Sequence, residues 1–230
     1  MAIQKNDFVE LEFIGKVKDG EVFDTNIEAE AKKLGYKENV KPSIVSVGNL
    51  MVVKGFDKAL EGKEIGKDYS VELEPKDAFG PRERSLIKTY PIKAFLEKNI
   101  NPYPGLVLAL DTTLAKVISV SGGRVILDFN NPLAGKILVY DFKIKRKVED
   151  IKEKVESLRD FFFQQPLEYE IQDKKLIIKA PKPFEQFILI YKDKFKDMLG
   201  LELEFKESEA KKLEAKTEEK VENILSEDKK

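Results

Sequence analysis

The sequence predicts an α+β protein, with a small antiparallel sheet packed on one short helix and further regions added to it. Three observations indicate this class. Segments that alternate apolar and polar residues recur through the first 148 residues, as in DFVELEFIGKV at 7–17. One short helical pattern lies among them, with Phe56, Ala59 and Leu60 on a single face. Longer helical patterns begin only after residue 149.

The first 84 residues contain the predicted sheet and helix. Asp19-Gly20 is a hairpin-type turn between the first two strands. The strand patterns span 7–17, 21–25, 42–48 and 69–75. A polar stretch at 27–38 predicts a short helix or a surface excursion, and Gly62 marks the end of the helix that carries Phe56. DAFGPRER at 77–84 predicts a loop.

Residues 85–130 have a different pattern, which predicts a small separate domain. We expect a helix at 91–98 and a rigid turn at 102–105, followed by short strands at 106–110, 114–120 and 124–129. The segment FNNPLAGKILVY at 129–140 then connects back to the first region. Asn131-Pro132 opens a turn in it, Gly135 tolerates any backbone conformation, and a long strand follows at 136–148.

Residues 149–230 predict a second α+β region with a charged tail. A helix at 150–163 places Ile151, Val155, Leu158 and Phe162 on one side, and 168–171 with 174–179 form a hairpin around Asp173. A helix at 183–199 and a strand in LELEF follow, before a Glu/Lys-rich end. The apolar face of the second helix comprises Phe184, Phe187, Ile188, Tyr191 and Phe195.

Composition excludes several kinds of chemistry. The chain has no Cys and no His, so cysteine nucleophiles, imidazole bases, disulfides and the usual zinc sites are absent. Its charged residues make up 36% of the sequence but nearly cancel at net −1, which argues against a general nucleic-acid binder. We find no secretion signal and no membrane-spanning run, and expect a cytoplasmic protein. Abundant Lys and Glu are typical of hyperthermophiles.

Several motifs, in order, resemble those of FKBP-type peptidyl-prolyl isomerases. They are EFIG at 12–15, GEVFDT at 20–25, SVG at 46–48, VVKGFDKALEG at 52–62, DAFG at 77–80 and ILVYDFKI at 137–144. The segment 85–130, ending in FNNPLAGK, resembles the insert-in-flap domain of SlyD-like members, and the extra C-terminal region resembles the long archaeal forms.

The resemblance implies three domains. Residues 1–84 and 131–148 form a discontinuous isomerase domain, an antiparallel half-barrel sheet wrapped on a short helix. Residues 85–130 form a β-rich insert-in-flap chaperone domain, and residues 149–230 form an α+β C-terminal domain. Departures limit what is implied: Asn131 replaces the usual hinge His and the tail lacks His and Cys, so no metal or cofactor is implied. Ser43 stands near the place of another pocket aromatic.

Prolyl isomerisation suits a chain without nucleophiles. The barrier of about 18–20 kcal/mol arises from amide resonance, and a water-poor pocket disfavours the planar, charge-separated amide more than the twisted one. By resemblance, proline packs on Phe56, the Val53 N–H holds a substrate carbonyl, and Asp24 is the polar group beside the amide. The remaining walls are Phe13, Phe23, Val52, Val53, Phe79 and Tyr140.

Each pocket residue also has a plainer interpretation. Without the resemblance, Phe56, Val52 and Val53 would be ordinary core, and Asp24 would cap a turn. Phe13 and Phe79 stand where family members usually have tyrosines, so hydrogen bonds to a substrate are lost. The alternative function is therefore a non-catalytic holdase or assembly module with a degenerate pocket.

The resemblance implies unfolded or proline-containing polypeptides as partners, bound on exposed apolar surface of the insert. The candidate client-binding residues are Ile87, Phe95, Tyr103, Leu106, Leu108, Val117 and Ile126. They could equally fill the insert's own core. Apolar residues in the C-terminal region also favour a homodimer. We expect neither nucleic-acid nor membrane partners.

Overall fold

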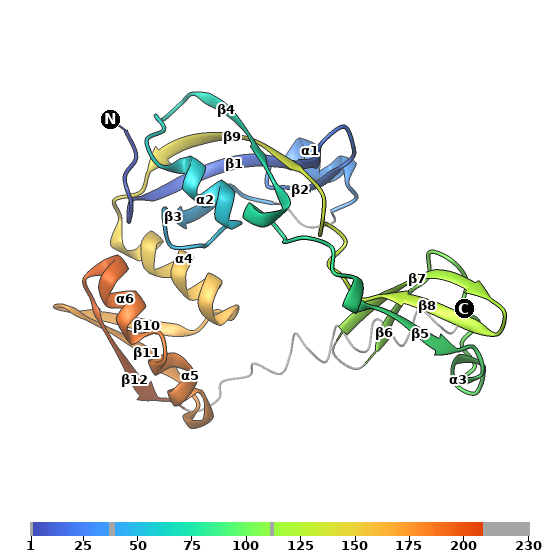
Figure 1. The fold of residues 1–230 in the computed structure, drawn as a ribbon. Coiled ribbons are helices and arrows are strands. Elements are labelled where there is room, and N and C mark those ends of the chain that lie inside the picture. The colour runs from blue at the N-terminus through green and yellow to red at the C-terminus, as the bar shows by residue number, and fades with distance from the viewer. Residues whose placement is uncertain (1, 37–39, 111–112, 209–230) are drawn as a thin grey trace. The chain divides into compact units, whose positions relative to one another are not determined.

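The computed structural model describes residues 2–36, 40–110 and 113–208 (Figure 1). The chain divides into two compact units. One comprises Met1–Ser43 and Val47–Lys147, and the other comprises Ile44–Ser46 and Val148–Lys230. Each unit is described below by itself. Most of the predicted charged tail, from residue 209 onward, lies outside the described residues.

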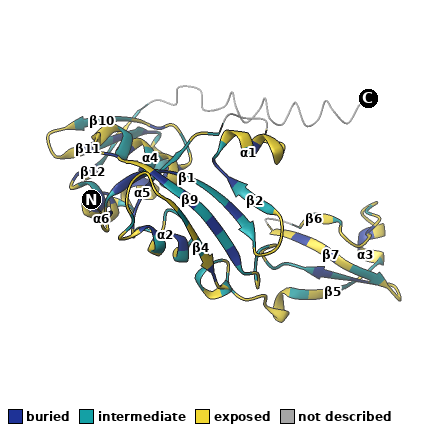
Figure 2. Cartoon of the chain, turned by 90° about the horizontal axis from the view of Figure 1, so that it is seen from above, coloured by how far each residue is buried: buried dark blue, intermediate teal, exposed yellow. Residues whose placement is uncertain are grey.

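The first unit contains the predicted antiparallel sheet, whose strand order is β2-β1-β9-β4. Its strands are β1 (Phe8–Val17), β2 (Val22–Thr25), β4 (Asp68–Leu73) and β9 (Leu138–Lys147), whereas β3 (Ser43–Ser46) has only Ser43 in this unit. Buried and partly buried residues alternate along β9 from Leu138 to Ile144, and β1 contains residues of both kinds (Figure 2). The α+β class with antiparallel sheets is thus confirmed.

One helix packs against this sheet. The unit's helices are α1 (Glu28–Lys33), α2 (Lys54–Leu60) and the short 3₁₀ turns η1 (Pro75–Asp77) and η2 (Arg84–Leu86). Phe56 and Leu60 of α2 are buried, and Phe56 contacts rings on both β1 and β9. The helix ends at Leu60, where Glu61 turns to extended geometry, and Gly62 follows in the left-handed region with φ at 77°, within two residues of the predicted stop.

The insert forms a four-stranded antiparallel sheet of its own, in the order β5-β8-β7-β6. Its elements are β5 (Ile87–Pro91), α3 (Lys93–Leu96), β6 (Val107–Leu110), β7 (Thr113–Ser121) and β8 (Arg124–Asp128). The predicted helix at 91–98 was too long, and β5 was not predicted. IKTYP ends in a proline, which a sheet tolerates at an edge, and β5 pairs only with β8.

The insert has its own small core, formed on one face of this sheet. Its buried members are Phe95, Ala115, Val117, Val125 and Leu127. Phe95 comes from α3 and the other four from β7 and β8, so the helix covers that face. Among the elements described for the insert, α3 is the one α-helix, and much of the insert's surface is exposed (Figure 2).

The chain enters and leaves the insert through a hydrogen-bonded neck, formed by Arg82, Glu83, Asp128 and Asn130. The Glu83 backbone N–H donates to Asn130 Oδ1 at 2.8 Å, and Asn130 Nδ2 donates to the Glu83 carbonyl at 3.0 Å. Arg82 and Asp128 form an ion pair at 2.5 Å. The two crossings of the chain are therefore tied to each other rather than left as independent linkers.

The second unit has a three-stranded sheet in the order β10-β11-β12, with β11 and β12 parallel. Its elements are α4 (Ile151–Phe163), β10 (Glu168–Gln172), β11 (Lys175–Ala180), η3 (Lys182–Phe184), α5 (Glu185–Leu189), α6 (Lys192–Leu199) and β12 (Glu202–Glu207). Asp150 caps α4 by accepting hydrogen bonds from two backbone N–H groups of its first turn.

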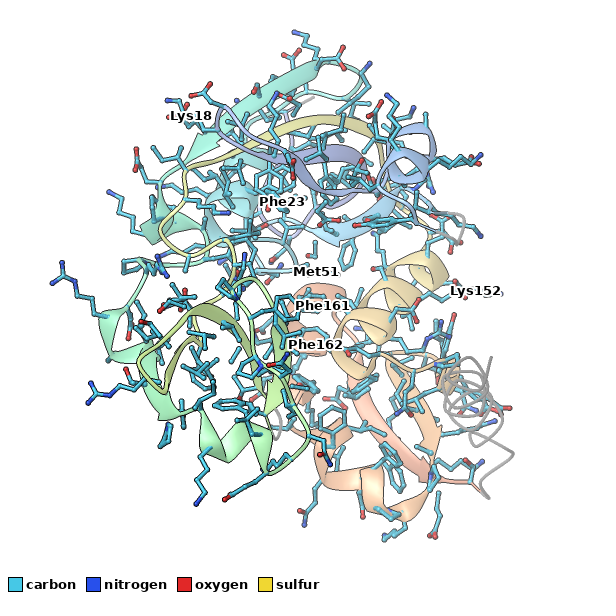
Figure 3. All side chains as sticks on the ribbon, turned by 90° about the vertical axis from the view of Figure 1, so that its right-hand side faces the viewer. Lys18, Phe23, Met51, Lys152, Phe161 and Phe162 are labelled. Atoms are coloured by element: carbon cyan, nitrogen blue, oxygen red, sulfur yellow. The ribbon has the colours of Figure 1, made fainter. Side chains whose placement is uncertain are left out.

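Two predictions for this unit were wrong in detail. The helix predicted at 183–199 is two helices, because the backbone leaves helical geometry at Tyr191, whose ψ is 6°. Phe195 is buried after this break, whereas Phe187 is 45% exposed. In α4, the buried ring near the C-terminal end is Phe163; Phe162 is half-buried and lies beside Phe161 (Figure 3). Ile151, predicted on the apolar face, is exposed.

No helix within residues 2–36, 40–110 and 113–208 has the length and apolar character required to span a membrane.

Candidate active site

Aromatic rings gather where α2 meets β1 and β9. The ring of Phe56 stacks on Tyr140, with centroids 4.5 Å apart and planes inclined by 17°. Phe13 and Phe142 each meet the Phe56 ring in a T-shaped contact, with centroid distances of 5.7 and 5.1 Å. Phe23 meets Tyr140 edge to face at 5.9 Å. Such geometries are favourable beyond the area that the rings bury. We call these five residues the aromatic cluster.

Strand register brings the cluster together. Phe13 on β1 lies opposite Phe142 on β9, and Gly15 lies opposite Tyr140. Because side chains alternate across a strand, all four residues share one face of the sheet. Gly15 also lies opposite Asp24 on β2. The residues named by motif at distant points of the sequence are therefore neighbours in the folded sheet.

Gly15 gives the rings the space to close. A Cβ at this position would lie 2.9 Å from the Phe23 ring and 3.0 Å from the Tyr140 ring. Real Cβ atoms do not approach other atoms this closely, so any side chain would force the two rings apart. A register shift follows Gly15 on β1 and leaves Phe23 without a direct partner there. Gly15 is thus required for space rather than for backbone conformation.

Two hydrogen bonds to its backbone hold Phe13 in place. Its N–H donates to Asn26 Oδ1 at 2.7 Å, and its carbonyl accepts from Thr25 Oγ1 at 2.7 Å. Asn26 also donates to the Leu11 carbonyl and to Ser43 Oγ. Both Thr25 and Asn26 are buried, so these bonds are protected from water. Ser43, at the place where an aromatic was expected, thus belongs to a polar bracket that positions Phe13.

The loop before α2 carries Val52 and Val53, both half-buried. Asp57 fixes this loop: its buried carboxylate accepts from the N–H groups of Gly48 and Leu50, each at 2.8 Å. Within the described residues, nothing accepts a hydrogen bond from the Val53 N–H. That donor remains available to an incoming carbonyl, as the sequence-based hypothesis requires.

Burial disfavours the charged form of two titratable groups in the site, Asp24 and Tyr140. Burial raises the pKa of Asp24 above its ordinary value, although a hydrogen bond from the Thr25 backbone opposes the shift. Burial, together with the charge of Asp24, raises the pKa of Tyr140 to about 12. The described residues contain no group of three or more carboxylates that could hold a metal ion.

Phe56 is only 1% exposed, so the surface proposed to receive proline is covered in the unliganded chain. Tyr140 is stacked on it and is itself 3% exposed. A substrate ring that packs on Phe56 must therefore displace part of this covering. Phe79 differs from the other predicted wall residues: it is 36% exposed and takes part in none of the ring contacts between described residues.

The seven candidate client-binding residues are divided between surface and core. Tyr103 is 58% exposed, and Ile87, Leu106, Leu108 and Ile126 are half-buried. Phe95 and Val117 are 5% and 1% exposed and lie in the insert's own core. Phe95 and Val117 therefore fill the insert's core, because a buried side chain offers no surface to a client.

Sequence reasoning missed four residues that shape the site. Phe142 was detectable, because it follows Tyr140 by two positions on a strand and so shares its face. Gly15 and Asp57 lie inside the motifs EFIG and VVKGFDKALEG, and Asn26 directly follows GEVFDT, but a motif does not reveal what each of these residues does. Their roles depend on which distant backbone lies next to them, and that is known only from the fold.

Comparison with known proteins agrees with this geometry. A family model described as FKBP-type peptidyl-prolyl cis-trans isomerase matches residues 1–96, and one described as the FKBP26 IF domain matches residues 88–133. The short-type peptidyl-prolyl cis-trans isomerase of Methanocaldococcus jannaschii is 36% identical over 146 residues, which cover 62% of this chain and 92% of that protein.

Bacterial relatives are more distant. The FKBP-type 16 kDa peptidyl-prolyl cis-trans isomerase of Escherichia coli is 26% identical over 148 residues, covering 62% of this chain and 92% of the relative. The SlyD isomerase of Aeromonas hydrophila is 29% identical over 147 residues, covering 63% and 64% of the two chains. With the ordered motifs and the aromatic cluster, these matches lead to one conclusion: the chain belongs to the FKBP-type peptidyl-prolyl cis-trans isomerase family.

Proposed function

We propose that this isomerase is a folding catalyst with a built-in client-binding domain: unfolded chains dock on the insert and present prolines to the aromatic cluster. The observation that carries the proposal is the juxtaposition of Phe13, Phe23, Asp24, Phe56 and Tyr140 at one end of a sheet. The connection between two adjacent strands of that sheet holds an independent sheet with its own core.

In the pocket, Phe56 is the floor and Phe13, Phe23, Val52, Val53, Phe79 and Tyr140 are the walls. Proline packs on the floor, and the Val53 N–H holds a carbonyl of the substrate. Twisting the amide removes its resonance and its charge separation, so exclusion of water favours the twisted state relative to the planar one. Each 1.36 kcal/mol of such preference corresponds to a tenfold rate increase.

Asp24 is the polar group in this water-poor environment. It lies across β1 from Tyr140, because Gly15 pairs with both. Its raised pKa shows that the site solvates a charge poorly. The substrate amide would meet the same environment, which favours its less polar, twisted form. No nucleophile and no general base take part.

The insert supports the chaperone part of the proposal through its exposed apolar side chains. Those exposed by more than a third are Leu86, Leu96, Tyr103, Val107, Leu114 and Ile118. Apolar surface on so small a domain is expected at an interaction site. We therefore propose residues 85–130 as the chaperone domain, within the discontinuous isomerase domain of residues 1–84 and 131–148. Residues 149–230 would be the third domain.

The test compares the intact chain with a variant in which residues 84–129 are replaced by a short Gly/Ser loop. Glu83 and Asn130 are hydrogen-bonded to each other, so a short loop can join them without strain. We expect the variant to keep isomerisation of a proline tetrapeptide and to lose most acceleration of a proline-limited protein refolding reaction. If both activities survive equally, the insert is structural and the chaperone function is wrong.

A second candidate function is a holdase whose isomerase pocket is degenerate. It is favoured by the covered Phe56 ring and by phenylalanines at positions 13 and 79, which cannot hydrogen-bond a substrate. The tetrapeptide assay separates the two functions. A folded protein without measurable catalysis, but able to suppress aggregation, would establish the holdase.

We also propose that the C-terminal region pairs two copies of the chain. Phe187, Leu189 and Ile190 in and after α5 are 45%, 38% and 73% exposed, an apolar edge that a second copy would cover. Sedimentation of the intact chain at micromolar concentration tests this. A clean monomer would remove the dimer from the proposal, without affecting the isomerase.

A further inference from the structure

The insert contains a groove of about 670 Å³ on the helix-covered side of its sheet. Its lining includes Tyr90 of β5, Ile100 after α3 and Phe129 after β8. These three pack against the insert's core while remaining only half-buried, so each has one side on the core and one on the groove. The volume lies within the range typical of ligand sites and can take several side chains.

The groove is cationic as well as apolar. Among the described residues that line it are Lys88 and Lys98, and none of these described lining residues is acidic. Lys88 lies opposite the core residue Leu127, so it projects to the same side as Tyr90. Its Nζ is 5.4 Å from the centre of the Phe129 ring, within range of a cation–π contact.

Both lysines retain an unneutralised charge. Many lysines of this chain pair with a carboxylate, as Lys93 does with Glu97 one turn along α3. Within the described residues, neither Lys88 nor Lys98 has an ion-pair partner. Two free ammonium groups beside an aromatic floor are complementary to a ligand that is apolar with a carboxylate next to it.

We propose that this groove binds extended client segments in which apolar or aromatic residues are flanked by Asp or Glu. The inference rests on the proposed chaperone function and adds a preference to it. Lys88 and Lys98 attract the flanking carboxylates, and Tyr90, Ile100 and Phe129 receive the apolar side chains. A nucleic acid is disfavoured as the occupant, because two lysines on a chain of net charge −1 cannot track a run of phosphates.

The experiment uses the full chain and two fluorescent peptides without proline, so that the isomerase pocket does not contribute. Both carry the apolar core Leu-Val-Phe-Leu, flanked by two Glu in one and by two Lys in the other. We expect the Glu-flanked peptide to bind about fivefold more tightly at low salt, and the difference to shrink at high salt because exposed charges are screened. Fluorescence anisotropy measures both affinities.

Charge reversal gives the sharpest result. The double variant Lys88→Glu/Lys98→Glu should reverse the preference, and Lys88→Gln/Lys98→Gln should abolish it. The matched control is Lys116→Gln on β7. Its neighbours Ala115 and Val117 are buried in the core, so Lys116 projects from the other face of the same sheet and should have no effect. Thermal unfolding checks the fold of each variant.

The experiment distinguishes failure of the charge-selective groove from failure of client binding by the insert. If both peptides bind the unaltered chain equally, or if charge reversal leaves the preference unchanged, the charge-selective groove is wrong while client binding stands. An equal effect of Lys116→Gln would also overturn it, because the preference would then belong to the insert's overall charge. If neither peptide binds, the proposed client-binding function of the insert itself fails.

Discussion

The ring of Tyr140 lies flat on the ring of Phe56, with centroids 4.5 Å apart and planes inclined by 17°. β9 supplies the first ring and α2 the second, so this contact joins the sheet to its helix. It also means that Tyr140 occupies the surface on which a substrate proline is proposed to pack. Both rings are nearly covered, with exposed fractions of 1% for Phe56 and 3% for Tyr140.

Replacing Phe56 by Leu should separate the packing role of this ring from its catalytic role. Leu retains most of the apolar volume, so we expect a loss of less than about 1.5 kcal/mol in the free energy of unfolding. Isomerisation should fall at least about tenfold, because the flat aromatic floor is lost. Denaturant unfolding and a tetrapeptide assay measure the two effects.

Tyr140→Phe is the control for this prediction, since it keeps the stacked ring and removes only the hydroxyl. We expect isomerisation within about twofold of the unaltered chain. A Phe56→Leu variant with full activity would show that Phe56 is core and not the floor of the site.

Replacing Gly15 by Ala should damage the site through space alone. The added Cβ would lie 2.9 and 3.0 Å from the rings of Phe23 and Tyr140, and the backbone of Gly15 is not in the left-handed region. We expect a stability loss of about 1–3 kcal/mol, as for overpacked cores, and a clear fall in isomerase activity. The double variant Gly15→Ala/Phe23→Leu should recover much of the stability but not the activity. If the double variant recovers no stability, the clash between the added Cβ and the Phe23 ring is not the cause of the loss.

Asp24→Asn should stabilise the folded chain at neutral pH. Burial raises the pKa of Asp24, so the folded state holds its proton to a higher pH than the unfolded state does. Stability therefore falls as pH rises from the ordinary Asp value of 3.8 through the raised pKa, and Asn is free of this loss. The stability advantage of the variant should grow from pH 3 to pH 7. Unfolding curves across that range measure it, and an advantage independent of pH would contradict the mechanism.

The contribution of Asp128 in the neck to stability should have the opposite pH dependence. Burial disfavours its charge, but hydrogen bonds from Asn130 and Arg82 and the charge of Arg82 outweigh this and lower its pKa. Its contribution to stability is present above the ordinary pKa of 3.8 and is lost as pH falls through the lowered value. We expect Asp128→Asn to cost about 1–3 kcal/mol at neutral pH, because a charged partner of Arg82 is lost.

The functional effect of the neck variant should be selective. Tetrapeptide isomerisation should change little, whereas acceleration of protein refolding should fall because the insert is held less firmly. Ser85→Ala, a nearby exposed change with one long 3.4 Å hydrogen bond, is the matched control. Equal losses in both assays would show that the neck serves the isomerase domain itself.

Local patterns were sufficient to predict much of the fold. Alternation located β1, β4 and β9, and Gly62 indicated the end of α2 to within two residues. The errors arose where packing overrides local pattern. The residues at 183–199 keep a helical period throughout, and nothing local reveals the break before Lys192.

The residues of the site likewise divide into those that motifs identify and those whose roles depend on packing. Phe56, Tyr140 and Phe23 could be selected because ordered motifs mark them, and the structure brings all three into ring contact. Gly15 and Asp57 lie in the same motifs, but their roles could not be predicted, since one acts by leaving space for distant rings and the other by bonding a loop several residues away. The exposure of the candidate client-binding residues was the least predictable feature, because an apolar residue in a small sheet looks the same in sequence whether it faces inward or outward.

Leu73 at the end of β4 lies directly opposite Leu138 at the start of β9. The stretch between them is therefore, in its connectivity, a single hairpin loop that happens to contain a folded sheet. The entropy needed to close a loop grows only with the logarithm of its length, and a neck that joins Glu83 to Asn130 shortens the effective path further. A domain can thus be added, exchanged or removed at this point with little effect on pairing of the two strands, which makes the loop a natural attachment point for new specificity.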